Sequence, residues 1–205
     1  MIRIKYSLEK AIQATAVILR QEGSQAERTR VLKLLYIADR ESLSERGTPI
    51  VGGRILALDN GPLHAEVYDL IRGQHESETT WSQFFRSEGY KVFLIADPDR
   101  LELSPYEVGK LTEVCERHRN QSTWKVADVT QEFQEWIDCH VSGKSEPIPA
   151  EKLLAALGFD EEDIKETIAE AEYYRRVQKV MDSRETLAEN RIDLNSKIRY
   201  VKSNT

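Results

Sequence analysis

Two cysteines and two histidines are the side chains of this sequence best suited to hold a metal ion. Cys115 and His118 have the spacing of one helix face, and Cys139 precedes His140 on a later helical stretch. Thiolate and imidazole together form tetrahedral zinc sites. Adjacent residues of a helix, however, point about 100° apart, so Cys139 and His140 would rarely bind one ion. We therefore expect no metal and no other cofactor, and interpret Cys115 and His118 as partly buried helix residues.

Other patterns that would indicate catalysis or phosphate binding are weak. The sequence has no G-x-S-x-G elbow, and nothing beside either cysteine would activate it as a nucleophile. Gly52, Gly53 and Gly61 do not follow a phosphate-loop pattern, because no lysine–serine pair accompanies them. The acidic pair Asp97 and Asp99 lacks the downstream ligands of a calcium loop, and a hairpin turn explains it better. Residue types alone thus predict no active site.

Composition restricts the class of protein. The 205 residues are 40% hydrophobic and 31% charged, which suits one globular domain with an extension. No apolar run approaches the ~20 residues that span a bilayer, and charges come too early for a secretory signal. Two cysteines are too few for a disulfide framework, and a net charge of −6 argues against general nucleic-acid binding. We expect a cytoplasmic protein with no membrane contact and no direct nucleic-acid contact.

The elements that would position these residues begin with two helices. The first follows Ser7 and ends before Gly23, with apolar residues at helical spacing. The second would open with a capping box formed by Ser24 and Glu27 and would end at Gly47. Its buried stripe would consist of Val31, Leu34, Leu35 and Ala38.

The middle of the chain predicts a small β element. Residues 50–58 read as a strand whose two glycines mark a bulge or a close backbone approach. Asn60-Gly61-Pro62 would then begin a helix with proline at its first position, where the missing N–H costs nothing. Residues 90–96 and 101–103 flank the turn sequence "DPDR" and predict a hairpin.

The C-terminal half reads as helical. The stretch from Ser104 to Glu107 combines an N-cap, a proline at the first position and a capping-box glutamate. Thr130 would cap a later helix, and a short helix would end at Gly158. From Asp160 onwards, acidic residues precede basic ones, an order that complements the helix dipole and predicts one long helix.

Together these elements predict an α+β fold that is mostly helical. A compact helical domain with a small antiparallel β element would occupy residues 1–158, and a helical extension would occupy residues 159–205. The extension carries only a thin apolar stripe, so it buries little surface of its own. A helix of this kind is expected to pack on another surface, such as a partner.

A helical pattern is interrupted by glycine and proline and then resumes in "RTRVLKLLYIADRESLSERGTPIVGGRILALDNGPLHAEVYDLI". It resembles the Panacea domain of SocA-like, phage-associated antitoxins: a leucine-rich helix, a Gly-x-Pro-Ile break, an alanine-bearing strand, and Gly-Pro before a tyrosine-containing helix. The segments "LELSPYEVGKLTEVCERH" and "VADVTQEFQEW" extend the resemblance to about residues 8–158. The family's threonine–histidine pair is Thr130-Gln131 here, so no role of that histidine carries over.

The resemblance implies an antitoxin that neutralises a cognate toxin, usually encoded by the adjacent gene, by direct protein binding. The family also includes a proteolytic adaptor that delivers its toxin to a cellular protease, so that mechanism stays open. The family resembles no known enzyme, and an enzyme of unrecognised type using Cys115 or the histidines is the third alternative. A homo-oligomer is compatible with all three.

Two groups of residues are predicted to contact a partner. The first group belongs to the family motif, and the second lies on the thin-striped extension, where tyrosine and arginine are typical of binding hot spots. They are Tyr36, Asp39, Arg40, Asn60, His64 and Tyr68 in the motif, and Tyr173, Arg175 and Arg176 in the extension. The alternative interpretation is that His64 and Tyr68 are ordinary helix-surface residues and that the extension presents a solvated flank.

Overall fold

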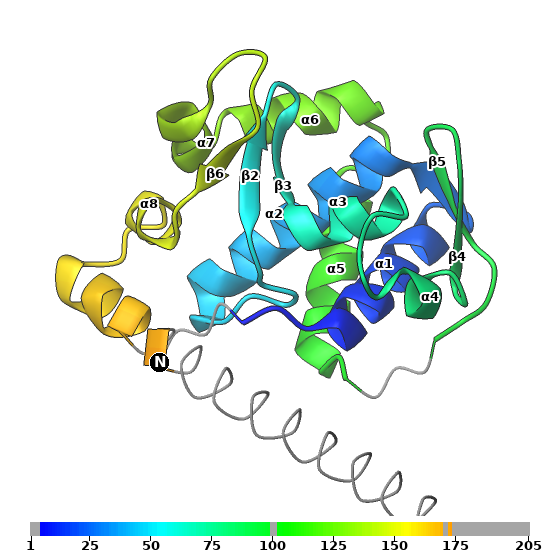
Figure 1. Ribbon diagram of the computed structural model, residues 1–205, viewed down its shortest axis with the longest axis horizontal. Coiled ribbons are helices and arrows are strands. Elements are labelled where there is room, and N and C mark those ends of the chain that lie inside the picture. The colour runs from blue at the N-terminus through cyan, green and yellow to red at the C-terminus, as the bar shows by residue number, and fades with distance from the viewer. Residues whose placement is uncertain (1–4, 99–101, 170–171, 174–205) are drawn as a thin grey trace, which may run out of the picture. The chain divides into compact units, whose positions relative to one another are not determined.

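The computed structural model describes residues 5–98, 102–169 and 172–173 (Figure 1). Residues up to Ile164 form one compact unit and residues 165–205 a second, and each is described by itself. In the second unit, helical turns run over 165–169. The domain boundary predicted between residues 158 and 159 stays a prediction.

Helices dominate the first unit, and short strands form two sheets. The helices are Leu8–Gln21 (α1), Arg28–Arg46 (α2), Ala65–Ile71 (α3), Glu78–Trp81 (α4), Pro105–Arg117 (α5), Thr123–Gln131 (α6), Gln134–Cys139 (α7) and Ala150–Ala156 (α8). The strands are Gln25–Glu27 (β1), Ile55–Leu58 (β2), Gly61–His64 (β3), Phe85–Glu88 (β4), Lys91–Leu94 (β5) and Glu146–Ile148 (β6). This arrangement confirms the predicted fold class, α+β and mostly helical.

Both sheets are antiparallel and join distant parts of the chain. One has the strand order β1-β5-β4 and the other β3-β2-β6. Ala26 of β1 lies opposite Val92 of β5, and Ile55 of β2 lies opposite Ile148 of β6. Strand β6 was not expected from the sequence, because Pro147 lies inside it and Pro149 follows it directly, and proline is rare within strands.

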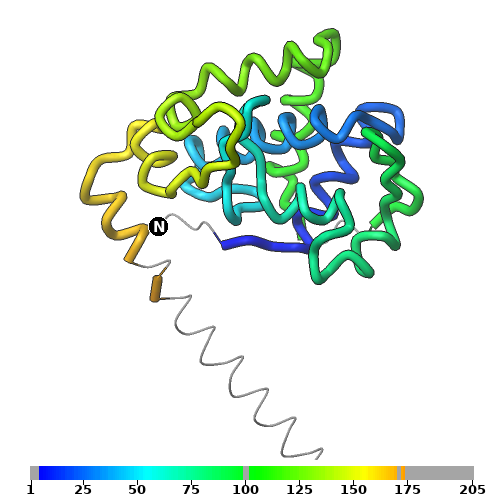
Figure 2. The backbone as a smooth tube through the Cα atoms, turned by 45° about the horizontal axis from the view of Figure 1, so that its top comes forward, coloured from blue at the N-terminus to red at the C-terminus, as the bar shows by residue number. Residues whose placement is uncertain are grey.

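Helix α2 is the centre of the unit. It packs against α1, α5, α6 and β3, and it runs through the middle of the backbone in both views (Figures 1 and 2). Every residue from Arg30 to Asp39 is buried, the polar ones included. The predicted stripe is therefore confirmed as part of the core, but the burial extends around the whole helix. Among the described residues, no helix is long and apolar enough to cross a bilayer.

Several predicted helix ends are confirmed. Ser7 caps α1, and its side chain accepts a hydrogen bond from the Lys10 N–H at 3.2 Å. Ser104 and Glu107 form the predicted capping box at the start of α5. Gly47 ends α2 in the left-handed conformation, with φ of 66°. Local side-chain chemistry decided these ends, which explains why the sequence was sufficient.

The predicted capping box at Ser24 and Glu27 is wrong. Residues Gln25–Glu27 form strand β1, and α2 begins at Arg28 without a side-chain cap. The Ser24 carbonyl accepts from the Leu94 N–H, and the Arg28 N–H donates to the Tyr90 carbonyl. The Ser24 N–H donates to the Leu19 carbonyl, and Glu27 is paired with Lys91 of β5, so the backbone is held by other partners than a capping box.

The helix predicted to begin at Asn60-Gly61-Pro62 is also wrong. Residues Gly61–His64 form β3, which pairs with β2 so that Leu58 lies opposite Gly61 and Ala57 opposite Pro62. The connection is a two-residue turn, and helix α3 begins only at Ala65. Strand β3 lies at the edge of its sheet, where a proline without an N–H is tolerated.

Two further predictions fail in the second half of the unit. Strand β5 pairs with β4 and β1, not with residues 101–103, of which Leu101 lies outside the described residues. Thr130 is buried inside α6 and donates to the Ala127 carbonyl at 2.8 Å, while Phe133 takes the N-cap position of α7. Sheet pairing overrides the local signal in the first case, and continuation of α6 through Thr130 overrides it in the second.

Replacing Gly61 with alanine is expected to lower the free energy of unfolding by about 3 kcal/mol, since a Cβ at positive φ would also overlap the Thr130 hydroxyl. Gly61 has φ of 92°, and Thr130 is the nearest neighbour of the added atom. Gly89→Ala is the matched control, because its φ is 58° and no atom lies within 4 Å of the added Cβ. Urea titration of both variants measures the difference. Equal losses would contradict close packing at Gly61.

Candidate functional site

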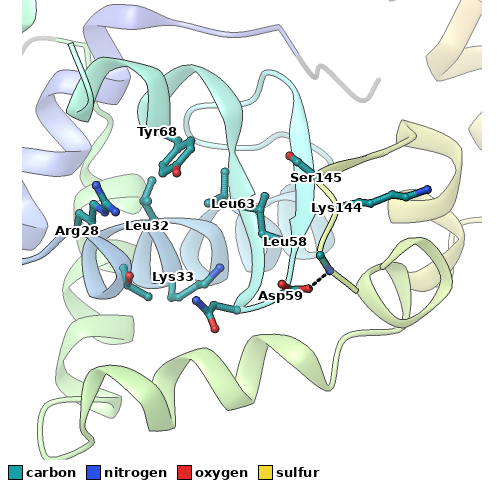
Figure 3. Close-up of a pocket in the computed structure, with 12 residues that line it drawn as sticks. Arg28, Leu32, Lys33, Leu58, Asp59, Leu63, Tyr68, Lys144 and Ser145 are labelled. Atoms are coloured by element: carbon teal, nitrogen blue, oxygen red, sulfur yellow. Dashed lines mark hydrogen bonds between the residues drawn. The ribbon is translucent and has the colours of Figure 1, made fainter. Parts of the chain in front are cut away.

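A pocket of about 360 Å³ opens between α2, the β2–β3 hairpin, α3 and a loop before β6 (Figure 3). Helix α2 supplies one side, and the hairpin, α3 and the loop supply the others. The lining residues are Arg28, Thr29, Leu32, Lys33, Leu58, Asp59, Asn60, Leu63, Tyr68, Gly143, Lys144 and Ser145. They come from three separated stretches of sequence, so only the fold brings them together.

The floor of the pocket is apolar and its walls are polar. Leu32, Leu58 and Leu63 line it between α2 and the hairpin, and the Tyr68 ring lies on the facing side (Figure 3). The Arg72 guanidinium stacks on the Tyr68 ring, 5.1 Å from its centroid, and holds it in place. An apolar floor with a few converging polar groups is the usual composition of a ligand site.

Asp59 holds the loop against the hairpin tip. Its carboxylate accepts from the Gly143 N–H at 2.9 Å and hydrogen-bonds His140 Nε2 at 2.9 Å. These two contacts, with His140 the larger, lower the pKa of Asp59. His140 also stacks on Trp136, with ring centroids 4.3 Å apart. His140 therefore serves as a loop anchor in this structure.

Lys33 ties the hairpin to α2 from below. Its side chain is 1% exposed, and Nζ donates to the carbonyls of Gly61 and Pro62 at 2.7 Å each. Burial lowers the pKa of Lys33 to about 7, because the ammonium form loses most of its hydration. The two carbonyl contacts fix the position of β3 and hence of Asn60 beside it.

We expect the free energy of unfolding of the protein to increase with pH because of Lys33, and Lys33→Met to abolish this increase. The folded state releases the Lys33 proton near pH 7, whereas the unfolded state keeps it up to about 10.5, so unfolding takes up a proton between these values. Native stability should then rise by about 2–3 kcal/mol from pH 7 to about pH 9, and the variant should lack this rise. Denaturant titrations of both proteins across this window measure it. A parallel rise in the variant would show that another group is responsible.

Asp39 and His64 form a buried pair behind the pocket. Asp39 accepts from the N–H groups of Val51 at 2.6 Å and Gly52 at 3.1 Å, and contacts His64 Nε2 at 3.0 Å. Burial raises the pKa of Asp39 to about 6, against the effect of its backbone donors. Burial, followed by the Lys33 charge, lowers the pKa of His64 to about 3. At neutral pH the contact thus joins a carboxylate and a neutral imidazole that donates through Nε2.

The effects of this pair on stability oppose each other as pH changes. Because the folded pKa of Asp39 lies above its usual 3.8, its contribution falls as pH rises from about 4 to 6. Because the folded pKa of His64 lies below 6.5, its contribution rises from about pH 3 to 6.5. The contributions of Asp39 and His64 oppose each other between about pH 4 and 6, and both are complete by pH 7, so the rise expected from Lys33 above pH 7 should be measurable.

A second buried network surrounds Glu135. Its side chain is 0% exposed and accepts from Tyr36 Oη at 2.8 Å and from Arg40 Nε at 2.7 Å. Burial, then the Glu135 charge, raises the pKa of Tyr36 well above its usual value. The Arg40 guanidinium also lies 4.2 Å from the centroid of the Phe133 ring. The network joins α2 to α7 across a long stretch of sequence.

The structure divides the predicted partner-binding residues. Tyr36, Asp39 and His64 are buried, so their side chains hold the interior together rather than lie on a surface. Arg40 is half-buried in the Glu135 network. Asn60 is exposed at the hairpin tip, Tyr68 is half-buried beside it, and both line the pocket.

In the extension, Tyr173 is 63% exposed. Arg175 and Arg176 lie outside the described residues. Arg28 and Lys144 of the pocket were not predicted. Even a correct prediction of the hairpin turn at Asp59-Asn60-Gly61 would not have identified Arg28 as a pocket residue. No local sequence pattern links Arg28 to the hairpin.

The cysteines and histidines first considered as metal ligands do not lie together around a common site. Burial raises the pKa of Cys115 to about 12, and His118 Nδ1 hydrogen-bonds Gln121 Oε1 at 2.7 Å. Cys139 is half-buried with a raised pKa, chiefly because of burial. Within the described ranges, no group of three His, Cys, Asp or Glu side chains is placed to hold an ion.

A family model described as antitoxin SocA-like, Panacea domain, matches residues 31–137. The chain belongs to the SocA-like Panacea family. The family resemblance stated from the motifs is thereby confirmed over these residues. The Panacea segment includes both buried networks and the hairpin, whereas Arg28 and the loop at 143–145 lie outside it. No curated protein and no solved structure matches the chain.

Proposed function

We propose that this Panacea protein is an antitoxin that neutralises one cognate toxin in the cytoplasm by binding it directly, without catalysing a reaction. Membership of the SocA-like antitoxin family over residues 31–137 carries the proposal. The toxin is expected to be encoded by the adjacent gene. A surface whose shape is fixed before the toxin arrives favours tight binding, because ordering a loop on binding lowers affinity.

The tip of the β2–β3 hairpin is the surface that we propose for toxin contact. Asn60 is exposed there, and the tip is held from two sides, by Lys33 through the β3 carbonyls and by Asp59 through Gly143 and His140. Tyr68 adds an aromatic side chain at the same pocket. A rigid tip beside an aromatic group supports a role in recognition.

Asn60→Lys is expected to weaken toxin binding by about tenfold or more, because a bulky cation would enter the contact without disturbing the buried side of the hairpin. Gln83→Lys is the matched control, an equal change at an exposed residue on another part of the unit. Isothermal titration of each purified chain with the toxin measures the affinities. Equal affinities for the two variants would remove the hairpin tip from the interface.

A chain that ends at Ile164 tests the extension in the same titration. The cut follows Ile164 because that side chain packs against the smaller apolar cluster of the first unit. Loss of affinity with an unchanged melting temperature would support a role of residues 165–205 in binding. Unchanged affinity would exclude them from the interface.

A further inference from the structure

The pocket beside the hairpin carries positive charge that the described chain does not neutralise. Arg28 has no carboxylate partner among the described residues, and neither does Lys144. Lys33 is only partly charged at neutral pH, because burial lowers its pKa to about 7, and its Nζ is already used by the Gly61 and Pro62 carbonyls. Most other described arginines and lysines are ion-paired, as Arg30 is with Glu22. Asp59 is the acidic member of the described lining, and His140 and Gly143 already use its carboxylate. The Arg28 side of the pocket is therefore cationic, in a chain whose net charge is −6.

Hydroxyl and amide groups in the pocket also lack partners. Within the described ranges, the side chains of Thr29, Asn60 and Ser145 and the hydroxyl of Tyr68 make no hydrogen bond. All four can donate as well as accept, and Arg28 adds groups that only donate. Such groups can donate hydrogen bonds to the acceptor atoms of a bound ligand.

The side-chain directions assign these groups different roles. In Figure 3, Arg28 and Leu32 follow one another along α2, and Tyr68 lies across the pocket from them. The Lys144 side chain points away from the pocket, so it is not assigned a contact. The Arg28 guanidinium lies 5.0 Å from the centroid of the Tyr90 ring, an arrangement that leaves its N–H edge available.

From these observations we propose that the pocket binds a small organic anion, with a carboxylate or phosphate at Arg28 and the Tyr68 hydroxyl and an apolar body on Leu32, Leu58 and Leu63. The volume of about 360 Å³ lies within the usual range of small-molecule sites, ~300–1,000 Å³. Binding does not depend on the antitoxin proposal, because it is a property of this chain alone. Arg28 lies outside the residues matched by the Panacea model, so the family match does not by itself imply this site.

The loop at Gly143-Lys144-Ser145 is not a phosphate-binding loop, although its residue types suggest one. The Gly143 N–H donates to Asp59, and strand β6 follows the loop in place of a helix. A phosphate loop needs free N–H groups at a helix start. The anion is therefore assigned to the Arg28 side of the pocket.

Phenyl phosphate and benzoate, titrated into the full chain by isothermal calorimetry, test the site and distinguish the two anionic groups. Inorganic phosphate and benzyl alcohol are the matched probes that lack the ring or the charge. We expect the better of the two ring anions to bind about tenfold more tightly than either matched probe. Arg28→Gln should weaken it by about fivefold and Tyr68→Phe by about threefold.

Arg46→Gln is the control variant, because Arg46 also stacks on a tyrosine, Tyr106, at 4.5 Å but lies outside the pocket. It should leave the affinity unchanged, and circular dichroism of each variant confirms folding. Saturable binding that depends on Arg28 would establish the site. No binding of either ring anion, equal binding of benzyl alcohol, or equal loss in Arg46→Gln would overturn it. Weakened toxin binding by Arg28→Gln without binding of any probe would instead assign the pocket to an acidic segment of the toxin.

Discussion

Replacing Asp39 with alanine is expected to lower the free energy of unfolding by about 4–5 kcal/mol, the largest loss expected of a single substitution here. The change removes the acceptor of the Val51 and Gly52 N–H groups and of His64 Nε2. All three donors are buried. Each unsatisfied buried donor costs about 1–3 kcal/mol. The summed cost of three such donors is therefore larger than the cost of losing one hydrogen bond.

Chemical denaturation of the purified variant measures the loss, with Asp128→Ala as its control. Asp128 pairs with Lys125 at 3.6 Å, and both side chains are more than half exposed, so its removal should cost below about 1 kcal/mol. The loss of unfolding free energy for Asp39→Asn should lie between those of Asp39→Ala and Asp128→Ala, because the amide oxygen still accepts one hydrogen bond. A small loss for Asp39→Ala would contradict the role given to this carboxylate.

Glu135→Ala is expected to cost about 4 kcal/mol. The change leaves the Arg40 guanidinium and the Tyr36 hydroxyl without their acceptor in an interior position. A half-buried cation that loses its carboxylate is costly, because part of its hydration is already lost and no other anion takes the place of Glu135. Phe133 keeps its contact with Arg40 but offers no hydrogen-bond acceptor.

Thermal unfolding and urea titration together report this loss. Tyr36→Phe removes one donor only and should cost about 1–2 kcal/mol. Glu88→Ala is the exposed counterpart, because Glu88 pairs with Arg86 at 3.2 Å on a strand surface and should be almost neutral. If Glu135→Ala proved as mild as Glu88→Ala, the network would not stabilise the junction of α2 and α7.

Local chemistry was sufficient to predict much of the fold. Ser104 and Glu107 form a capping box from residues three apart, and Gly47 ends its helix in the conformation that glycine favours. The mostly helical α+β class followed from such signals and from apolar spacing. Each depends on interactions within one or two turns of the chain, which a sequence pattern records directly.

Long-range pairing was not predictable in the same way. Asn60-Gly61-Pro62 fits both a helix start and a hairpin, and the choice depends on β2 lying beside β3. Apolar spacing indicated only one buried face of α2, and Asp39 was predicted to contact a partner from its place in the family motif. Burial of that residue follows from packing on several sides of α2, and its partner His64 comes from another element.

The candidate site was predicted only in part for the same reason. Asn60 and Tyr68 were identified from the family motif and do line the pocket. Arg28 and the loop at 143–145 join them only through the fold, because more than a hundred residues separate the two in sequence. No local pattern marks such a pocket.

The central claim is that this Panacea protein neutralises a toxin by binding it. Co-expression with the product of the adjacent gene, scored by growth and by affinity purification of the complex, tests the claim most directly. We predict that the chain restores growth and co-purifies with a toxin that persists in the cell. Restored growth with a protease-dependent loss of toxin would establish the adaptor mechanism and contradict sequestration. Arrested growth despite accumulation of both proteins would contradict the antitoxin proposal itself.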